Sequence, residues 1–87
     1  MITGKTSTGF SFEIDESNFD SWELLELMSD VETNAAKIVP AARMLLGNEY
    51  EPLKEHVKKT NDGRMPIETV TNEIMEIFSM VPNGKNS

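Results

Sequence analysis

The chain has no cysteine among its 87 residues. A disulfide framework and thiolate metal ligands are therefore excluded, and stability must come from packed apolar faces. The chain also lacks any run of about 18 apolar residues that could cross a bilayer, and its first twenty residues lack the apolar centre of a secretory signal. We expect a soluble cytoplasmic protein with one domain over residues 1–82 and a flexible tail over 83–87.

Residues that carry chemistry are also scarce. His56 is the single histidine, and no glycine-rich phosphate loop is present. We expect His56 on the outward surface of a helix, since no second imidazole can complete a site. The segment from Asp15 to Glu26 has the spacing of a calcium loop, but Phe19 and Asp20 stand where a ligand and a glycine are needed. The sequence predicts no enzyme, no cofactor and no metal site.

Positive charge is absent from one long segment. The net charge is −7, and residues 13–32 contain no lysine or arginine. The acids of this segment are Glu13, Asp15, Glu16, Asp20, Glu23, Glu26, Asp30 and Glu32. Such a surface repels phosphate backbones and anionic lipid headgroups, which disfavours binding to nucleic acid or to membranes.

The apolar pattern predicts a mainly α protein in which a short N-terminal β-hairpin packs on a compact bundle of three to four helices. Phe10, Phe12 and Ile14 alternate with polar residues, which is typical of a strand with one buried face. This hairpin is expected over residues 2–14. The predicted helices are 20–33, 40–46, 49–59 and 66–81.

Local signals set the predicted helix starts. Asp20 is the expected N-cap of the first helix, with Phe19 packing on Leu24 as a hydrophobic staple. Pro40 is expected in the first turn of the second helix, because proline is tolerated there but not in a helix interior.

Two helices differ in the width of their apolar faces. The last helix has an inner stripe of about 100°, formed by Ile67, Val70, Ile74, Ile77, Phe78 and Val81. The first helix has an apolar face of about 220°, roughly twice the usual width, formed by Trp22, Leu24, Leu25, Leu27, Met28 and Val31. One neighbouring helix cannot cover so broad a face.

Three methionines, Met44, Met75 and Met80, lie off the inner stripes of their helices. Flexible thioethers adapt to varied partner surfaces, so these three residues with Trp22 and Leu25 are the predicted partner-binding residues. In the alternative interpretation, the first helix is simply central in the bundle and the methionines fill gaps in the core.

The order of the predicted elements and their amino-acid sequences resemble those of the small tail assembly chaperones of long-tailed, non-contractile bacteriophages and related prophages. The matching segments are TSTGFSFEIDESNFDSWELLELM, IVPAARMLLGNEYEPLKEHV and DGRMPIETVTNEIMEIF. They cover most of residues 5–78. None is a catalytic fingerprint, and the resemblance assigns no binding residue to a numbered position.

The resemblance implies a non-enzymatic role in the cytoplasm of the host bacterium. A chaperone of this family coats the long tape measure protein, keeps it soluble, helps tail-tube subunits polymerise around it, and is absent from the mature virion. Many copies act on each client, and a homo-oligomer is one possible state.

A rival hypothesis comes from the acidic segment. Small acidic proteins can mimic DNA by presenting carboxylates spaced like phosphates to a DNA-binding protein. The bases Lys54, Lys58, Lys59 and Arg64 argue against it, because a mimic needs acids over much of one surface.

Overall fold

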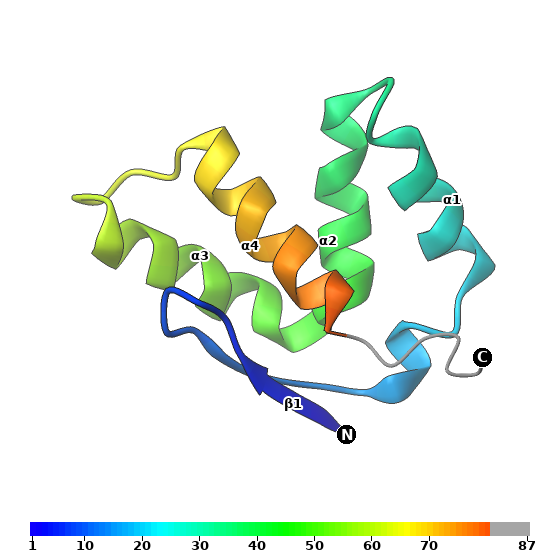
Figure 1. Ribbon diagram of the computed structural model, residues 1–87, viewed down its shortest axis with the longest axis horizontal. Coiled ribbons are helices and arrows are strands. Elements are labelled where there is room, and N and C mark those ends of the chain that lie inside the picture. The colour runs from blue at the N-terminus through cyan, green and yellow to red at the C-terminus, as the bar shows by residue number, and fades with distance from the viewer. Residues whose placement is uncertain (81–87) are drawn as a thin grey trace.

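The computed structural model describes residues 1–80 and has a mainly α fold with a short N-terminal antiparallel β-hairpin, which confirms the predicted fold class (Figure 1). Its strands and α-helices are β1 (Ile2–Lys5), β2 (Ser11–Ile14), α1 (Trp22–Asp30), α2 (Ile38–Leu46), α3 (Tyr50–Thr60) and α4 (Ile67–Ser79). Short 3₁₀ turns are η1 (Glu16–Asn18), η2 (Ala35–Lys37) and η3 (Gly47–Glu49). The predicted tail over 83–87 and the predicted end of the last helix at residue 81 lie outside the described residues.

The hairpin has the alternation that the sequence predicts. β1 and β2 pair antiparallel, with Gly4 opposite Phe12 and Ile2 opposite Ile14. Phe12 and Ile14 are buried while the residues between them are exposed, so one face of β2 packs on the helices. The turn is closed by a hydrogen bond of 2.8 Å from the backbone N–H of Thr6 to the carbonyl of Phe10.

Gly4 leaves room for the buried ring of Phe12. A Cβ atom at this position would come within 2.7 Å of Phe12 Cζ. We expect Gly4→Ala to lower the free energy of unfolding by about 1–3 kcal/mol, because the ring must move in a packed site. Urea unfolding measures this loss. An unchanged midpoint would show that the ring repacks freely.

The first helix is shorter than predicted and has a different cap. Ser21, not Asp20, is the N-cap, and its Oγ accepts a 3.1 Å hydrogen bond from the backbone N–H of Leu24. Ser21 has the extended backbone that an N-cap requires. The helix ends at Asp30, not at residue 33, and residues 31–33 form a turn in which the Asp30 carbonyl accepts the backbone N–H groups of Thr33 and Asn34 and the hydroxyl of Thr33.

The second and third helices confirm the expected places of the prolines. α2 begins at Ile38, two residues before the predicted start. Pro40 still lies in the first turn, where its missing N–H is not needed. Gly47, with a φ of 53°, ends α2 in a conformation that favours glycine. α3 begins at Tyr50, which also places Pro52 in a first turn.

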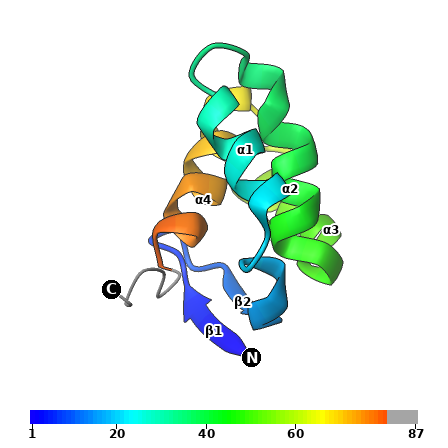
Figure 2. The same ribbon diagram turned by 90° about the vertical axis from the view of Figure 1, so that its right-hand side faces the viewer.

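The core gathers around α2, which packs against α1, α3 and α4. Figure 2 shows α1 toward the viewer, with α4 to its left, α2 to its right and the hairpin below them. The buried apolar side chains are Phe10, Phe12, Ile14, Leu24, Ile38, Ala41, Ala42, Leu45, Leu46, Leu53, Val57, Ile74 and Ile77. Ile67, predicted to belong to the inner stripe of the last helix, is instead 80% exposed at the first turn of α4.

Candidate protein-binding site

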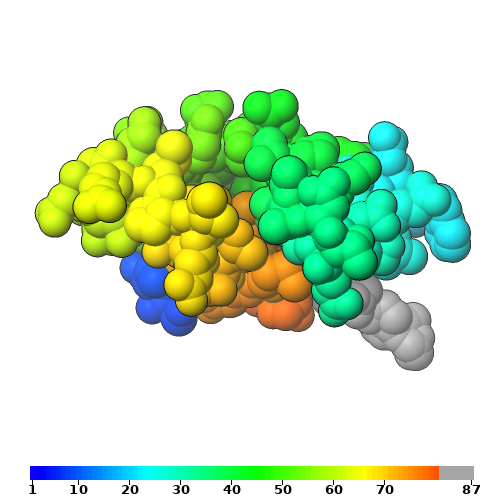
Figure 3. Space-filling model, turned by 90° about the horizontal axis from the view of Figure 1, so that it is seen from above, coloured from blue at the N-terminus to red at the C-terminus, as the bar shows by residue number. Residues whose placement is uncertain are grey.

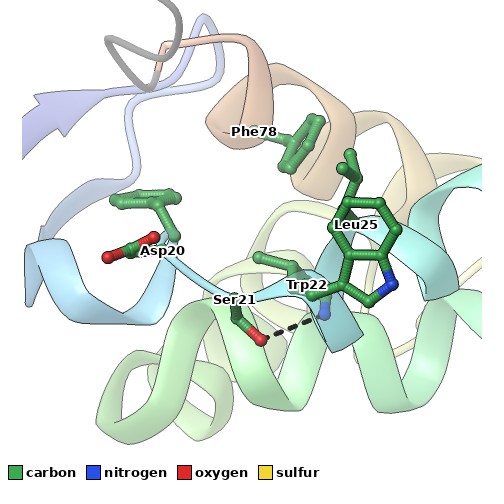
Figure 4. Close-up of a pocket in the computed structure, with 7 residues that line it drawn as sticks. Asp20, Ser21, Trp22, Leu25 and Phe78 are labelled. Atoms are coloured by element: carbon green, nitrogen blue, oxygen red, sulfur yellow. Dashed lines mark hydrogen bonds between the residues drawn. The ribbon is translucent and has the colours of Figure 1, made fainter.

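A hollow of about 260 Å³ lies between the start of α1 and the end of α4, and we call it the α1–α4 pocket. It is lined by Phe19, Asp20, Ser21, Trp22, Leu24, Leu25 and Phe78. Leu25 of α1 and Phe78 of α4 face one another across it, and Trp22 lies beside Leu25 at the rim (Figure 4). The pocket is therefore mainly apolar, with a carboxylate at one edge.

The pocket exists because α1 is covered on one flank only. Leu24 points into the core and is buried, and α1 packs against α2. Trp22 is 74% exposed and Leu25 is 52% exposed on the other flank. A helix whose apolar face exceeds one neighbour leaves part of that face in solvent, which is the arrangement expected from its 220° width, about twice the usual stripe.

The predicted methionines separate into two groups. Met75 is 43% exposed and lies one turn before Phe78 on α4, so the two side chains are neighbours on that helix. Met80 is also exposed, but its Sδ lies near Gly4 of β1 rather than in the pocket. The structure corrects the placement of Met44, which is half-buried and packs against the core. Of the predicted residues, Trp22 and Leu25 line the pocket and are exposed, and Met75 is exposed beside the pocket residue Phe78 on α4.

The helices on either side of the pocket carry acids and no bases. α1 contributes Glu23, Glu26 and Asp30, and α4 contains no lysine or arginine. The two ion pairs among residues 1–80, Lys54–Glu51 and Lys58–Glu55, both lie within α3. The acids of α1 therefore have no ion-pair partner in the described part of the chain.

The acidic character continues into the segment before α1. Asp15 accepts a 2.9 Å hydrogen bond from the backbone N–H of Ser17, and this bond, with a second from the Ser17 side chain, lowers the pKa of Asp15 below its ordinary value. Hydrogen bonds to the charged form favour that form, so this carboxylate stays ionised at neutral pH.

A second apolar surface was missed by the sequence analysis. A hollow of about 180 Å³ near the starts of α2 and α4 is lined by exposed Val39, Met65 and Ile67 and by partly covered neighbours that include Lys54. The starts of these helices lie side by side in green and yellow in Figure 3. The periodicity of the last helix predicted an apolar row that begins at Ile67. Only the tertiary structure shows that α2 and α3 leave Ile67 uncovered.

The prediction that His56 lies free on the surface of its helix is wrong. The histidine is half-buried, its ring centre is 5.5 Å from that of Phe10, and its Nε2 is 3.0 Å from Thr8 Oγ1. Thr8 donates its single hydroxyl proton to Glu73, so His56 must donate to Thr8 through Nε2–H. Glu73 is only 3% exposed, and its Oε1 has no hydrogen-bond partner among the described atoms.

A second contact reinforces this polar tie between the hairpin turn and the helices. The backbone N–H and the hydroxyl of Ser7 both donate to the Glu76 carboxylate, at 2.7 and 3.1 Å. Apart from Glu73 Oε1, the polar atoms of this cluster bond to one another, which favours a structural role in docking the hairpin on α3 and α4.

Two further observations apply to residues 1–80. These residues contain no cluster of three or more histidine, aspartate or glutamate side chains that could hold a metal ion. None of the helices in the same part of the chain has the length and apolar character needed to span a membrane. In comparisons of the chain with known proteins, no family model matches, and no curated protein or solved structure is significantly similar.

Proposed function

We propose that this protein is a non-enzymatic tail assembly chaperone that binds the tape measure protein of a long-tailed phage. The observation that carries the proposal is the α1–α4 pocket, whose lining includes the exposed side chains of Trp22 and Leu25. Exposed Met75 lies one turn before the pocket residue Phe78 on α4. The segment-by-segment resemblance to that family supports the same role. The proposed site of action is the host cytoplasm before the virion is complete.

These three exposed side chains are surplus to the protein's own core. Thirteen apolar side chains are already buried around α2 without Trp22, Leu25 or Met75. Exposed apolar side chains that gather around a hollow, with polar residues beside them, are typical of protein-interaction sites. This arrangement suits reversible binding to an apolar segment of another polypeptide.

Charge and shape together suit a chaperone of this kind. The tape measure protein is long and helical, so many copies must bind along it, each through a modest contact. A net charge of −7 on every bound copy makes the coated client repel other coated clients. The apolar contact would hold the client while the acidic surface keeps the complex soluble until tail-tube subunits replace it.

The test is co-expression with the tape measure protein of the same phage. We expect the client in the soluble fraction with the unaltered chain, and in the pellet when Leu25→Ser and Met75→Gln are combined. Both side chains are exposed, so the variant should fold normally by circular dichroism. The control is Ile67→Ser, which changes an even more exposed apolar residue on the other apolar surface and should keep the client soluble.

The proposal fails if the client is equally soluble with and without this chain. It also fails if the Ile67→Ser control lowers client solubility as much as the pocket variant does, because the contact would then be a general apolar one.

The unpaired acids of α1 keep the DNA-mimic hypothesis as a second candidate. Salt separates the two candidates, because exposed charge contacts weaken as ionic strength rises whereas apolar contacts persist. A complex with a DNA-binding protein that dissociates steeply between about 0.1 and 0.5 M salt would favour the mimic.

A further inference from the structure

The charges around the α1–α4 pocket specify the chemistry of its occupant, and this inference rests on the proposed function. We infer that the pocket receives an amphipathic helix whose apolar side chain enters between Leu25 and Phe78 and whose lysine or arginine residues lie over the acids of α1. The occupant is thus a basic amphipathic helix rather than a neutral or acidic one.

The size of the pocket favours a protein side chain over a small molecule. Ligand pockets that enclose a drug-sized molecule usually measure about 300–1,000 Å³. The α1–α4 pocket measures about 260 Å³ and opens between two helices. A helix that places one large apolar residue into such a hollow uses the common helix-in-groove mode, in which residues at i, i+3, i+4 and i+7 act as anchors.

The acids lie immediately beside the apolar contact. Glu26 follows Trp22 by four residues, so the two side chains are neighbours on the exposed surface of α1. Glu23 and Asp30 lie farther around α1, in a separate hollow that they share with Lys37. Asp20 lines the pocket itself. A partner helix along Trp22 and Leu25 therefore brings one of its flanks next to two carboxylates, those of Asp20 and Glu26.

No base lies on the pocket side of these two helices, and Lys37 of η2, which shares another hollow with Glu23, Glu26 and Asp30, forms no ion pair in the described part of the chain. α1 and α4 contain no lysine or arginine, and the described ion pairs lie within α3. Glu73 and Glu76 of α4 accept hydrogen bonds from the hairpin, so they do not compete for a partner at the pocket. Basic residues on the occupant are the groups that complement this rim.

The length of α1 sets the extent of the contact. Nine residues at 1.5 Å per residue span about 13 Å, which is between two and three turns of a partner helix. The basic residues should therefore lie within one turn of the apolar anchor. A contact of this size is modest, in agreement with a chaperone that binds through many copies.

Three synthetic helical peptides test the inference on the full-length protein. They share one leucine-rich face and differ only in the flanking residues, which are lysine, glutamine or glutamate. The peptides contain no tryptophan, so the fluorescence of Trp22, the single tryptophan, reports binding. We expect the lysine peptide to bind most tightly and the glutamate peptide most weakly, with the affinity for the lysine peptide falling as salt rises from about 0.05 to 0.5 M.

Charge variants show which carboxylates contribute to binding of the lysine peptide. Asp20→Asn combined with Glu26→Gln should weaken binding of the lysine peptide by about two- to five-fold for each carboxylate removed. The matched control is Glu51→Gln combined with Glu55→Gln, which removes the same charge from α3 and should leave the affinity unchanged. Leu25→Ser should weaken binding of the lysine and glutamine peptides alike.

The outcomes separate this inference from the proposed function. Equal affinity for all three peptides, or an equal effect of the α3 control, would overturn the basic-helix inference. Self-association of the chain through Leu25, detected by sedimentation, would overturn it as well, because a second copy would then occupy the pocket. If the lysine peptide binds as expected but the tape measure protein stays equally soluble without the chain, the chaperone proposal fails while the inference stands.

Discussion

Replacing Leu45 with alanine is expected to lower the free energy of unfolding by about 2–5 kcal/mol. Leu45 lies on α2, the helix against which the others pack, and is fully buried. Truncation removes apolar contacts and leaves a cavity that surrounding helices fill only in part. Since small domains have a total stability of about 5–15 kcal/mol, this one change should remove a large share of it.

Leu25→Ala is the matched control for this prediction. It is the same substitution on a residue that is half exposed at the rim of the pocket, and we expect a change within about 0.5 kcal/mol. Urea unfolding followed by far-ultraviolet circular dichroism measures both variants. Similar losses of unfolding free energy in the two variants would show that Leu25 belongs to the core. The pocket would then not be a binding surface.

Thr8→Val is expected to lower the free energy of unfolding by about 1–3 kcal/mol. The substitution keeps the shape of the side chain but removes the hydroxyl that bonds Glu73 of α4 and His56 of α3. Glu73 is buried and already has one oxygen without a partner, so losing the second bond leaves a buried carboxylate poorly compensated. The hairpin turn would lose its Thr8 hydrogen bonds to both helices and keep those from Ser7 to Glu76 of α4.

Thr3→Val is the control for the loss of the Thr8 hydrogen bonds, because it is the same change at an exposed position of the same hairpin. We expect little effect on the unfolding midpoint there. Amide hydrogen exchange adds a local readout, since Thr8→Val should raise exchange at Thr6 and Gly9, whose N–H groups close the turn. Equal unfolding midpoints in the two variants would show that the polar cluster contributes nothing to docking.

These two experiments bear on function because they separate the scaffold from the surface. Leu45 and Thr8 hold the helices and the hairpin together, while Leu25 and Met75 lie exposed beside a pocket. A binding surface that can be changed without loss of stability is what the chaperone proposal requires. Variants of the rim are therefore expected to alter binding alone.

Hydrophobic periodicity was sufficient to predict the hairpin and the existence of every α-helix. The alternation of Phe10, Phe12 and Ile14 and the three- and four-residue spacing in the helices depend on backbone geometry, which is local. Helix ends were less accurate, as the Ser21 cap and the early start of α2 show. Capping depends on the backbone conformation of a single residue, and Asp20 and Ser21 are equally suitable by type.

The candidate site could be predicted only in part. The broad apolar face correctly indicated that Trp22 and Leu25 exceed what one neighbour can cover. Helical spacing grouped Met44 with Met75 and Met80, yet Met44 packs against the core. The pocket itself needs Phe78 from α4, which is 53 residues after Leu25 of α1, and no local pattern indicates that these two helices lie near one another.

The sequence by itself determined which segments form strands and helices, which side chains share a face, and where positive charge is absent. The tertiary structure decided which of those faces are covered: Ile67 is exposed, His56 is half-buried, and Leu25 lies open beside Phe78. The physical reason is that periodicity describes a side chain relative to the axis of its own helix. Burial depends instead on the neighbouring elements, and their placement results from packing of the whole chain.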